Sequence, residues 1–334
     1  MAPVVMWIGL GSLGKAACER LVSHGCLDSP LILYNRTTQK CHDLASSLPP
    51  GTTKIVLSLK EGISKADIIF SCLTNDAVVE STYQSIISDL ATADNPDGLQ
   101  GKLFIGTETV HPDTADTLAD RLAGHGADFL ACPVLGPPAA AAAGQLIAFP
   151  AGPAAALSRA APYITGNGGG CGALARAAIA FPDQPCGTGP RMKIIANTFT
   201  LSAACQLAEA FTLAEKSGVG AAAVGEFVEL CLVGGPAGTN PFHVYAGRML
   251  RGDYWREGEE RPAGAVALGV KDLGLAVRLA EEAGATVRNP FVALGWCRDV
   301  LEGDGCGRGE LRGDISGIYG AVRETAGLRF ENDG

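Results

Sequence analysis

A glycine pattern near the start of the chain restricts the possible fold more than any other feature. Gly9, Gly11 and Gly14 form a G-x-G-x-x-G directly after an apolar run at residues 4–8, and a helical pattern follows at residues 15–22. Between a strand and a helix, the first glycine permits a tight turn, the second lets backbone N–H groups approach a pyrophosphate, and the third lets the helix pack closely on the strand. The pattern predicts dinucleotide binding, and a glycine-rich turn without a ligand is the weaker alternative. The residues expected to contact the dinucleotide are Gly9, Gly11, Ser12, Leu13 and Gly14.

The end of the next apolar run indicates which dinucleotide binds. Leu31–Tyr34 should be the second strand, and Asn35, Arg36 and Thr37 follow it. Sites specific for NAD usually place Asp or Glu here to bind the ribose 2′-hydroxyl, whereas a guanidinium can pair with a 2′-phosphate. The sequence therefore favours NADP(H), held by these three residues. The alternative is a solvated arginine at a strand end.

Composition sets outer limits on the class of protein. The 334 residues can form two domains, and a net charge of −9 without a basic stripe argues against nucleic acid as a partner. Apolar runs are too short to span a membrane, and a strand that begins near residue 3 leaves no room for a secretion signal. Eleven cysteines and five histidines show no metal-binding spacing. We expect no bound metal, buried thiols and a cytoplasmic location.

The first half of the chain alternates strand and helix signals, which predicts a doubly wound α/β domain. Further strands are expected at residues 53–59, 67–73, 103–106, 128–132 and 145–151, with helices at residues 77–90 and 112–123 among them. The alanine run at residues 139–143 is compatible with a loop or a helical turn. A glycine-rich loop at residues 166–172 precedes the expected domain boundary.

After Gly189 the strand signals end and apolar residues recur at helical spacing. Residues 192–217 should form one helix, ~39 Å long at 1.5 Å per residue. Further helices are expected at residues 221–232, 269–283 and 289–301. The predicted architecture is an α/β Rossmann-type N-terminal domain, residues 1–188, joined by a long interdomain helix to an all-α C-terminal domain, residues 189–334.

A second motif introduces the chemistry. Gly187-x-Gly189 is followed by Lys193 and Asn197, which are four residues apart and therefore share one helix face. Near the start of a helix that faces the expected cleft between domains, a lysine can protonate a carbonyl oxygen as hydride arrives, or remove the hydroxyl proton in reverse. Without further information, an ordinary surface lysine beside a locally bonded asparagine is the better interpretation of the motif alone.

Short motifs along nearly the whole chain together resemble the β-hydroxyacid dehydrogenase family. That family includes 3-hydroxyisobutyrate dehydrogenase and, more distantly, 6-phosphogluconate dehydrogenase. The matching pieces are residues 9–14 (GLGSLG), 35–37 (NRT), Cys72-Leu73, Thr109-x-x-Pro112, Pro133-Val134-x-Gly136, residues 187–197 (GTGPRMKIIAN), Lys271-Asp272-Leu273 and Asp314-x-Ser316.

The resemblance implies roles for particular residues. Lys193 would be the catalytic acid or base, and Asn197 would bind the substrate hydroxyl or carboxylate. Thr109 would lie beside the nicotinamide, and Lys271 would reach the cofactor or the substrate from the helical domain. The cofactor-binding set implied beyond the glycine turn includes Cys72, Leu73, Thr109 and Lys271. The resemblance also implies a small-molecule substrate and a homodimer formed through the helical domain.

The sequence departs from the family pattern in two places. Where the family usually reads D-x-S-T-x-x-P, this chain has Gly106 for the Asp and Glu108 for the Ser. Where the family reads P-V-S-G-G, this chain has Leu135, Gly136 and Pro137 after the valine. Leu135 and Gly136 are the expected substrate contacts, yet Leu135 has no hydroxyl and Pro137 has no N–H to offer a carboxylate. We therefore expect a more apolar pocket than a small hydroxy acid requires.

Three functions remain open from the sequence. The first is an NADPH-dependent reductase of a small carbonyl compound, or the reverse dehydrogenase. The second is an NADPH-dependent imine reductase or reductive aminase, a related class that usually carries Asp or Tyr where this chain has Lys193. The third is a non-catalytic NADPH-binding module, against which the retained Lys193 and Asn197 argue.

Overall fold

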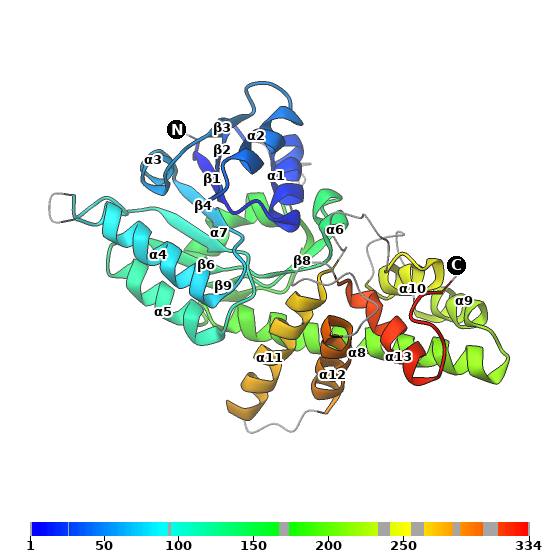
Figure 1. The fold of residues 1–334 in the computed structure, drawn as a ribbon. Helices are drawn as coiled ribbons and strands as arrows, with labels where there is room; N and C mark the ends of the chain where they lie inside the picture. Colours follow the sequence, from blue (N-terminus) through cyan, green and yellow to red (C-terminus); the bar gives the residue numbers. More distant parts are fainter. Residues whose placement is uncertain are drawn as a thin grey trace. The chain divides into compact units, whose positions relative to one another are not determined.

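The computed structural model describes residues 2–25, 27–92, 95–166, 174–232, 241–254, 264–282, 288–302 and 313–332. The chain forms two compact units, Met1–Lys193 and Ile194–Gly334 (Figure 1). The loop expected at residues 166–172 falls outside the described residues except for Gly166.

The first unit is built on an eight-stranded sheet in the order β11-β9-β6-β5-β4-β1-β2-β3. The run from β3 through β1 and β4 to β6 is parallel and has the strand order of dinucleotide-binding domains. The eight strands of the whole sheet are β1 (Val5–Ile8), β2 (Leu31–Tyr34), β3 (Thr53–Ile55), β4 (Ile68–Ser71), β5 (Leu103–Gly106), β6 (Asp128–Ala131), β9 (Ala151–Gly152) and β11 (Phe181–Pro182). Strand order reverses between β1 and β4, so a crevice for a ligand is expected beyond their carboxyl ends.

Helices cover both faces of this sheet (Figure 1), and each face has its own apolar core. On the first face, Trp7 of β1 stacks on Phe70 of β4 with ring centroids 5.3 Å apart. The helices on that face are α1 (Ser12–His24), α2 (Gln39–Ser46), α6 (Pro138–Ala142) and α7 (Ala154–Ile164). The helices on the other face are α3 (Leu59–Lys65), α4 (Asp76–Leu90) and α5 (Pro112–Ala123). The predicted doubly wound domain is confirmed.

Three details of the first unit differ from or refine the prediction. The strand expected at residues 53–59 ends at Ile55, because Ser58 accepts the Glu61 N–H at 3.2 Å and caps α3. The strand expected at residues 145–151 is two strands, since Pro150 has no N–H to continue the ladder. Its first part, β8 (Leu146–Ala148), belongs to a separate sheet with β7 (Val134–Leu135) and β10 (Ala175–Ala178). The alanine run forms α6.

The second unit is helical, as predicted. Its helices are the main part of α8 (Thr188–Ser217), α9 (Ala221–Leu232), α10 (Pro241–Arg251), α11 (Val266–Glu282), α12 (Asn289–Glu302), the 3-10 turn η1 (Ile315–Gly317) and α13 (Ile318–Thr325). In the described residues of this unit, strand pairing is limited to one bridge between Ala265 and Asp314. Aromatic rings of Phe211, Tyr254 and Tyr319 form the centre of its core.

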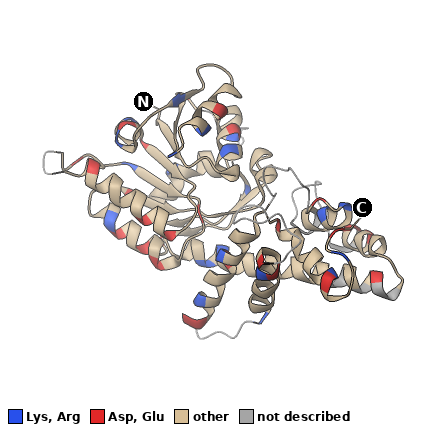
Figure 2. Ribbon diagram, viewed as in Figure 1, with Lys and Arg blue, Asp and Glu red and all other residues tan. Residues whose placement is uncertain are grey.

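Surface charge is mixed in both units. Basic and acidic residues are interspersed on the surface helices (Figure 2), so the net charge of −9 is distributed over the molecule. Within the described ranges, every helix is too short or too polar to traverse a bilayer.

Candidate cofactor-binding and catalytic site

The turn between β1 and α1 has the geometry of a dinucleotide cradle. Gly9 has φ +98°, and a Cβ there would lie 2.3 Å from the Cys72 carbonyl oxygen. A Cβ on Gly14 would lie 2.2 Å from the Gly9 oxygen, so the helix packs on the turn at a distance that only glycine permits. Beneath the turn, Trp7 Nε1 donates a hydrogen bond of 2.9 Å to the same Gly9 oxygen.

Gly11 has a different role in that turn. It is the N-cap of α1, and a Cβ there would have open space around it. Gly11 and Ser12 are exposed, Leu13 is half-buried, and the first turn of α1 carries no acidic residue. The first N–H groups of α1 and the positive end of the helix dipole lie beside this open space, an arrangement that suits a pyrophosphate.

Two side chains in the loop after β2 differ in role: Asn35 is hydrogen-bonded within the protein, and Arg36 is exposed. Asn35 Oδ1 accepts the Leu10 N–H at 2.9 Å, and Asn35 Nδ2 donates to the Thr37 oxygen at 3.0 Å. Asn35 therefore holds the glycine turn in place, a role that the motif did not reveal. Arg36 and Thr37 are exposed, and no hydrogen bond or ion pair of the Arg36 guanidinium is found within the described part of the chain.

The carboxyl ends of β4 and β5 lie against the glycine turn. The Cys72 N–H donates to the Ile8 oxygen at 2.9 Å, and the Leu73 N–H donates to Glu108 Oε2 at 3.2 Å. Glu108 is buried, and Thr109, which follows it, is half-buried. The structure thus brings the predicted residues Gly9, Cys72 and Leu73 together at one edge of the sheet.

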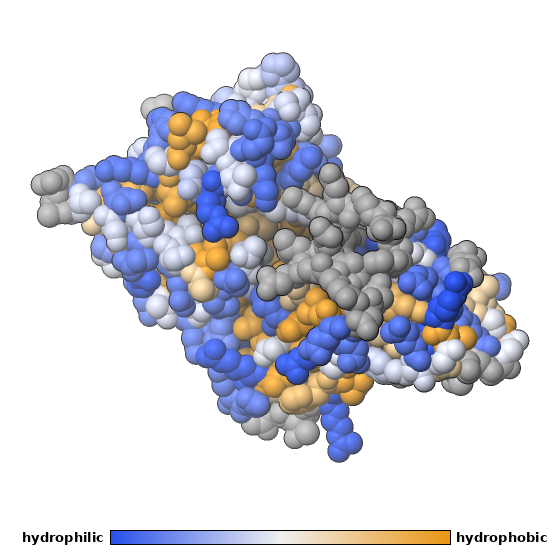
Figure 3. All heavy atoms as spheres, in the orientation of Figure 1, coloured by the Kyte–Doolittle hydropathy of each residue, from blue (hydrophilic) through white to orange (hydrophobic). Residues whose placement is uncertain are grey.

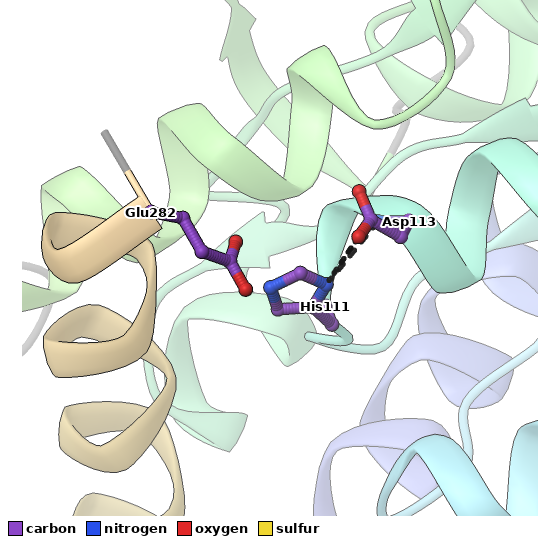
Figure 4. A group of neighbouring side chains, drawn as sticks. All are labelled: His111, Asp113 and Glu282. Atoms are coloured by element: carbon purple, nitrogen blue, oxygen red, sulfur yellow. Dashed lines mark hydrogen bonds and ion pairs between the residues drawn. The ribbon is translucent and has the colours of Figure 1, made fainter. Parts of the chain in front are cut away.

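His111 has a structural role at the start of α5. It is the N-cap residue, and its Nδ1 accepts the Asp113 N–H at 3.4 Å and lies 3.6 Å from Asp113 Oδ2 (Figure 4). Its own N–H donates to Asp76 Oδ1 at 2.7 Å, which links the starts of α4 and α5. Glu282, also drawn there, belongs to the second unit and pairs with Arg278 of its own helix.

The segment between β6 and α6, which contains β7, carries the expected substrate contacts. Leu135 is half-buried, and Gly136 has φ +140°. Pro137 is the N-cap of α6 and Pro138 its first residue, so the start of this helix has two fewer N–H groups to offer an anion. The wall formed by Leu135 and the two prolines is therefore poor at holding a carboxylate.

The two glycines before Lys193 fix the start of α8 on the first unit. A Cβ on Gly189 would lie 2.4 Å from the Phe149 oxygen and 3.2 Å from the Ala131 oxygen, at the carboxyl end of β6. The Gly187 N–H donates to Asp116 Oδ1 of α5 at 2.6 Å. Lys193, one turn after Gly189, is buried with 7% of its surface exposed. An ordinary solvated lysine is thereby excluded.

Asn197 and Lys271 meet through a third residue in the second unit. Asn197 Nδ2 donates to Asp272 Oδ2 at 2.6 Å, and Lys271 Nζ lies 2.9 Å from Asp272 Oδ1. Asp272 therefore orients both predicted residues. Asn197 is buried, and it lies one turn after Lys193 on α8.

Sequence reasoning assigned no role to several residues that hold these groups. The sequence pattern does not indicate the role of Asp116, because a single acidic residue in a helix is common. Asp272 was noted only as a neighbour of Lys271. Ser71 and Tyr83, which contact each other at 3.0 Å beside Glu108, resembled ordinary core positions. Only the Glu108 departure from the family pattern marked this cluster in advance.

Comparisons with known proteins agree with this geometry. Residues 4–174 match the family described as the NAD binding domain of 6-phosphogluconate dehydrogenase. Residues 187–305 match the family described as NAD-binding of NADP-dependent 3-hydroxyisobutyrate dehydrogenase. The chain belongs to the β-hydroxyacid dehydrogenase family. It is an NAD(P)-dependent oxidoreductase of the hydroxyacid dehydrogenase type, and its cofactor is a nicotinamide dinucleotide.

Individual relatives of this dehydrogenase differ in their named activities. An NADH-dependent oxidoreductase, ucdB, of Aspergillus ustus is 30% identical over 95% of this chain and 98% of its own. An NADPH-dependent reductive aminase of Aspergillus oryzae is 29% identical over 36% of each chain. A 3-hydroxyisobutyrate dehydrogenase structure from Salmonella typhimurium has the same fold, with a TM-score of 0.74, 22% identity and coverage of 95% of this chain and 99% of that one.

Proposed function

We propose that this dehydrogenase uses NADPH to reduce an uncharged carbonyl compound, with Lys193 as the general acid. The observation that carries the proposal is the placement of Lys193, buried one turn after a glycine that presses α8 onto the carboxyl end of β6. The reduced nicotinamide supplies the hydride when bound. The Lys193 ammonium donates its proton to the carbonyl oxygen, and it can take a hydroxyl proton back in the oxidative direction.

The preference for NADPH rests on charge at the end of β2. The exposed Arg36 guanidinium can pair with a 2′-phosphate, and the residues from Asn35 to Thr38 include no carboxylate for a 2′-hydroxyl. The Aspergillus ustus relative is named for NADH. Titration of this chain with NADH and with NADPH measures which of the two it prefers.

The substrate class follows from the wall beside the α8 start. Gly189 lies against Pro133 and Phe149, with its Cβ position 3.3 Å from Pro133 Cδ, so the loop that carries Leu135 adjoins the helix that carries Lys193. A carboxylate placed there would lose hydration without gaining donors from Leu135, Pro137 or Pro138. An uncharged aldehyde or ketone avoids that penalty.

Imine reduction is the second candidate, and the same apolar wall favours it. A neutral imine or amine would also fit beside Leu135, and a reductive aminase is among the partial relatives. Lys193 argues against imine reduction, because the imine reductases that resemble this family usually carry Asp or Tyr at that position. A ketone presented with and without an amine separates the candidates by the product formed.

The test of the proposed mechanism replaces Lys193. We expect Lys193→Ala to lower kcat by ~10²–10⁴, the usual contribution of a positioned general acid. The dissociation constant of NADPH should change little. Lys60→Ala, at an exposed position of α3, is the matched control and should behave as the unmodified enzyme. A near-normal kcat for Lys193→Ala removes this residue from the mechanism.

We also infer a homodimer in the cytoplasm. Exposed apolar side chains support an interface through the helical unit, since Phe227 and Leu230 of α9 are 55% and 78% exposed. Hydrophobic residues are visible on the surface among hydrophilic ones (Figure 3). The homodimer is tested by light scattering in solution, which should give twice the 34.2 kDa mass of one chain.

The thiols support the cytoplasmic location. Burial raises the pKa of the Cys132 thiol to about 12 and of the Cys186 thiol to about 11, as expected of inert thiols in a reducing compartment.

A further inference from the structure

The two departures from the family pattern, Gly106 and Glu108, occupy the same region of space, where one residue lacks a side chain and the other supplies one. A Cβ on Gly106 would lie 2.9 Å from Glu108 Oε1 and 3.1 Å from Phe129 Cζ. The Glu108 side chain therefore turns back and fills the space beside residue 106. A glycine at 106 is what makes room for the glutamate at 108, and the two positions have to be considered as a pair.

Glu108 is the acceptor at the end of a buried hydrogen-bonded chain. Ser71 Oγ donates to Glu108 Oε1 at 2.9 Å and lies 3.0 Å from the Tyr83 hydroxyl oxygen. Because the single Ser71 hydroxyl proton goes to Glu108, Tyr83 must donate to Ser71. Burial, reinforced by the nearby Glu108 charge, raises the pKa of Tyr83, so the phenol keeps its proton. The order of donors is thus fixed.

The same carboxylate holds the backbone at the edge of the sheet. Its Oε2 accepts the Leu73 N–H at 3.2 Å, directly after the Cys72 carbonyl that lies against Gly9. Thr107 adds a second tie, since its N–H and its Oγ1 donate to the Ser71 oxygen at 2.9 and 2.7 Å. The ends of β4 and β5 are thereby joined to each other and pressed against the glycine turn of β1.

We propose that Glu108 is a positioning residue for the cofactor, which it serves by holding the Cys72–Leu73 backbone against the glycine turn. The inference rests on the proposed function only in that the nicotinamide dinucleotide binds at that turn. Glu108 acts through the Leu73 N–H and Ser71. A carboxylate at residue 106 with a small residue at 108 would be the alternative way to fill the same space, so the two arrangements should be exchangeable only together.

A double-mutant cycle tests the exchange, with the equilibrium dissociation constant of NADPH as the readout in the absence of substrate. Glu108→Ser should weaken NADPH binding about tenfold, since the Leu73 and Ser71 donors lose a charged acceptor. Gly106→Asp alone should weaken it at least as much, because the new side chain meets Glu108 and Phe129. The double variant should bind NADPH within about threefold of the unmodified enzyme.

A second pair of variants covers the case in which the cycle variants do not fold. Glu108→Gln keeps the shape and an acceptor for the Leu73 N–H, and NADPH affinity should stay within about threefold. Glu108→Leu has a similar size without an acceptor and should bind NADPH about tenfold more weakly. Glu80→Ser, an exposed position of α4, is the control for loss of one negative charge and should leave the affinity unchanged.

Two results would overturn the inference. One is an NADPH affinity that Glu108→Ser and Glu108→Leu leave unchanged even if the midpoint of thermal unfolding falls, because Glu108 would then stabilise the core without positioning the cofactor. The other is a double variant, Gly106→Asp with Glu108→Ser, whose loss of NADPH binding free energy equals the sum of the losses of the two single variants. Neither depends on catalysis by Lys193, because all affinities are measured without substrate, so a failure of the proposed mechanism is seen separately.

Discussion

Two helices of the first unit, α1 and α6, begin near the carboxyl ends of strands but differ in the backbone N–H groups that they can offer an anion. α1 starts at Gly11, with exposed backbone N–H groups and open space beside the glycine. α6 starts at Pro137 and Pro138, which have no N–H to donate. The start of α1 therefore suits an anion better than the start of α6 does.

Under the proposed function, the cofactor and the substrate would be recognised through different parts of the chain. At α1 the backbone would bind the cofactor, and glycines are needed because a side chain would fill the open space at Gly11 or collide with Cys72 and Gly9. At α6 the side chains of Leu135 and Pro137 set the character of the wall. A family can therefore keep one loop while the other changes with the substrate.

The largest expected effect comes from closing the open space at α1. Gly11→Val should weaken NADPH binding by about 100-fold or more, because the new side chain occupies the place of the pyrophosphate. Gly11 has φ −72° and a Cβ there touches nothing, so the fold should not be disturbed. Titration of NADPH and the unfolding midpoint are the measurements. Gly295→Ala, at another open glycine in α12, is the control. Unchanged NADPH affinity would contradict the assignment of this turn.

An intermediate effect is expected from the loop after β2, which we propose binds the 2′-phosphate. Arg36→Ala should weaken NADPH binding by roughly 10- to 100-fold, since a charge-assisted hydrogen bond contributes roughly 1.5–3 kcal/mol. NADH binding should barely change, which makes NADH the internal control. Equal affinity of the unmodified enzyme for NADH and NADPH would show that Arg36 does not select the cofactor.

The smallest expected effect comes from giving the α6 loop back its donors. Leu135→Ser with Pro137→Gly adds a hydroxyl and an N–H, and should raise kcat/KM for succinic semialdehyde relative to an uncharged aldehyde of similar size by about tenfold. Leu57→Ser, at a position 75% exposed, is the control. If the unmodified enzyme already prefers the acid, a carboxylate is held by other residues and the interpretation of Leu135 is wrong.

The contrast between the two loops also explains what the sequence could predict. The α/β sheet could be predicted because strand and helix signals alternate along the chain. The glycine turn could be predicted because a positive φ and close backbone approach leave few residue choices, as at Gly9. The long helix was accessible from its apolar spacing, although it begins at Thr188 and not near Met192. The interruption at Pro150 required knowing which sheet each half of the segment joins, and local pattern does not contain that information.

Long-range side-chain pairs were beyond the sequence for a similar reason. Glu108 and Ser71 are 37 residues apart, and Asn197 and Asp272 are 75 apart. Their types are common and their spacing has no period, so only the folded backbone brings them together. Asn35 illustrates a different case, since the motif predicts a cofactor contact and the structure adds bonds of its side chain to Leu10 and Thr37 that the motif did not indicate. Direct contact of Asn35 with NADP(H) stays a prediction.

The indole of Trp7 gives the molecule an optical property. It lies beneath the glycine turn, stacked on Phe70 and hydrogen-bonded to the Gly9 oxygen, and the chain has three tryptophans in all. Tryptophan emits in the near-ultraviolet, where reduced nicotinamides absorb, so excitation can pass from a buried indole to a dinucleotide bound nearby. Occupancy of the turn should therefore quench Trp7 emission and appear as sensitised nicotinamide emission, without any added label.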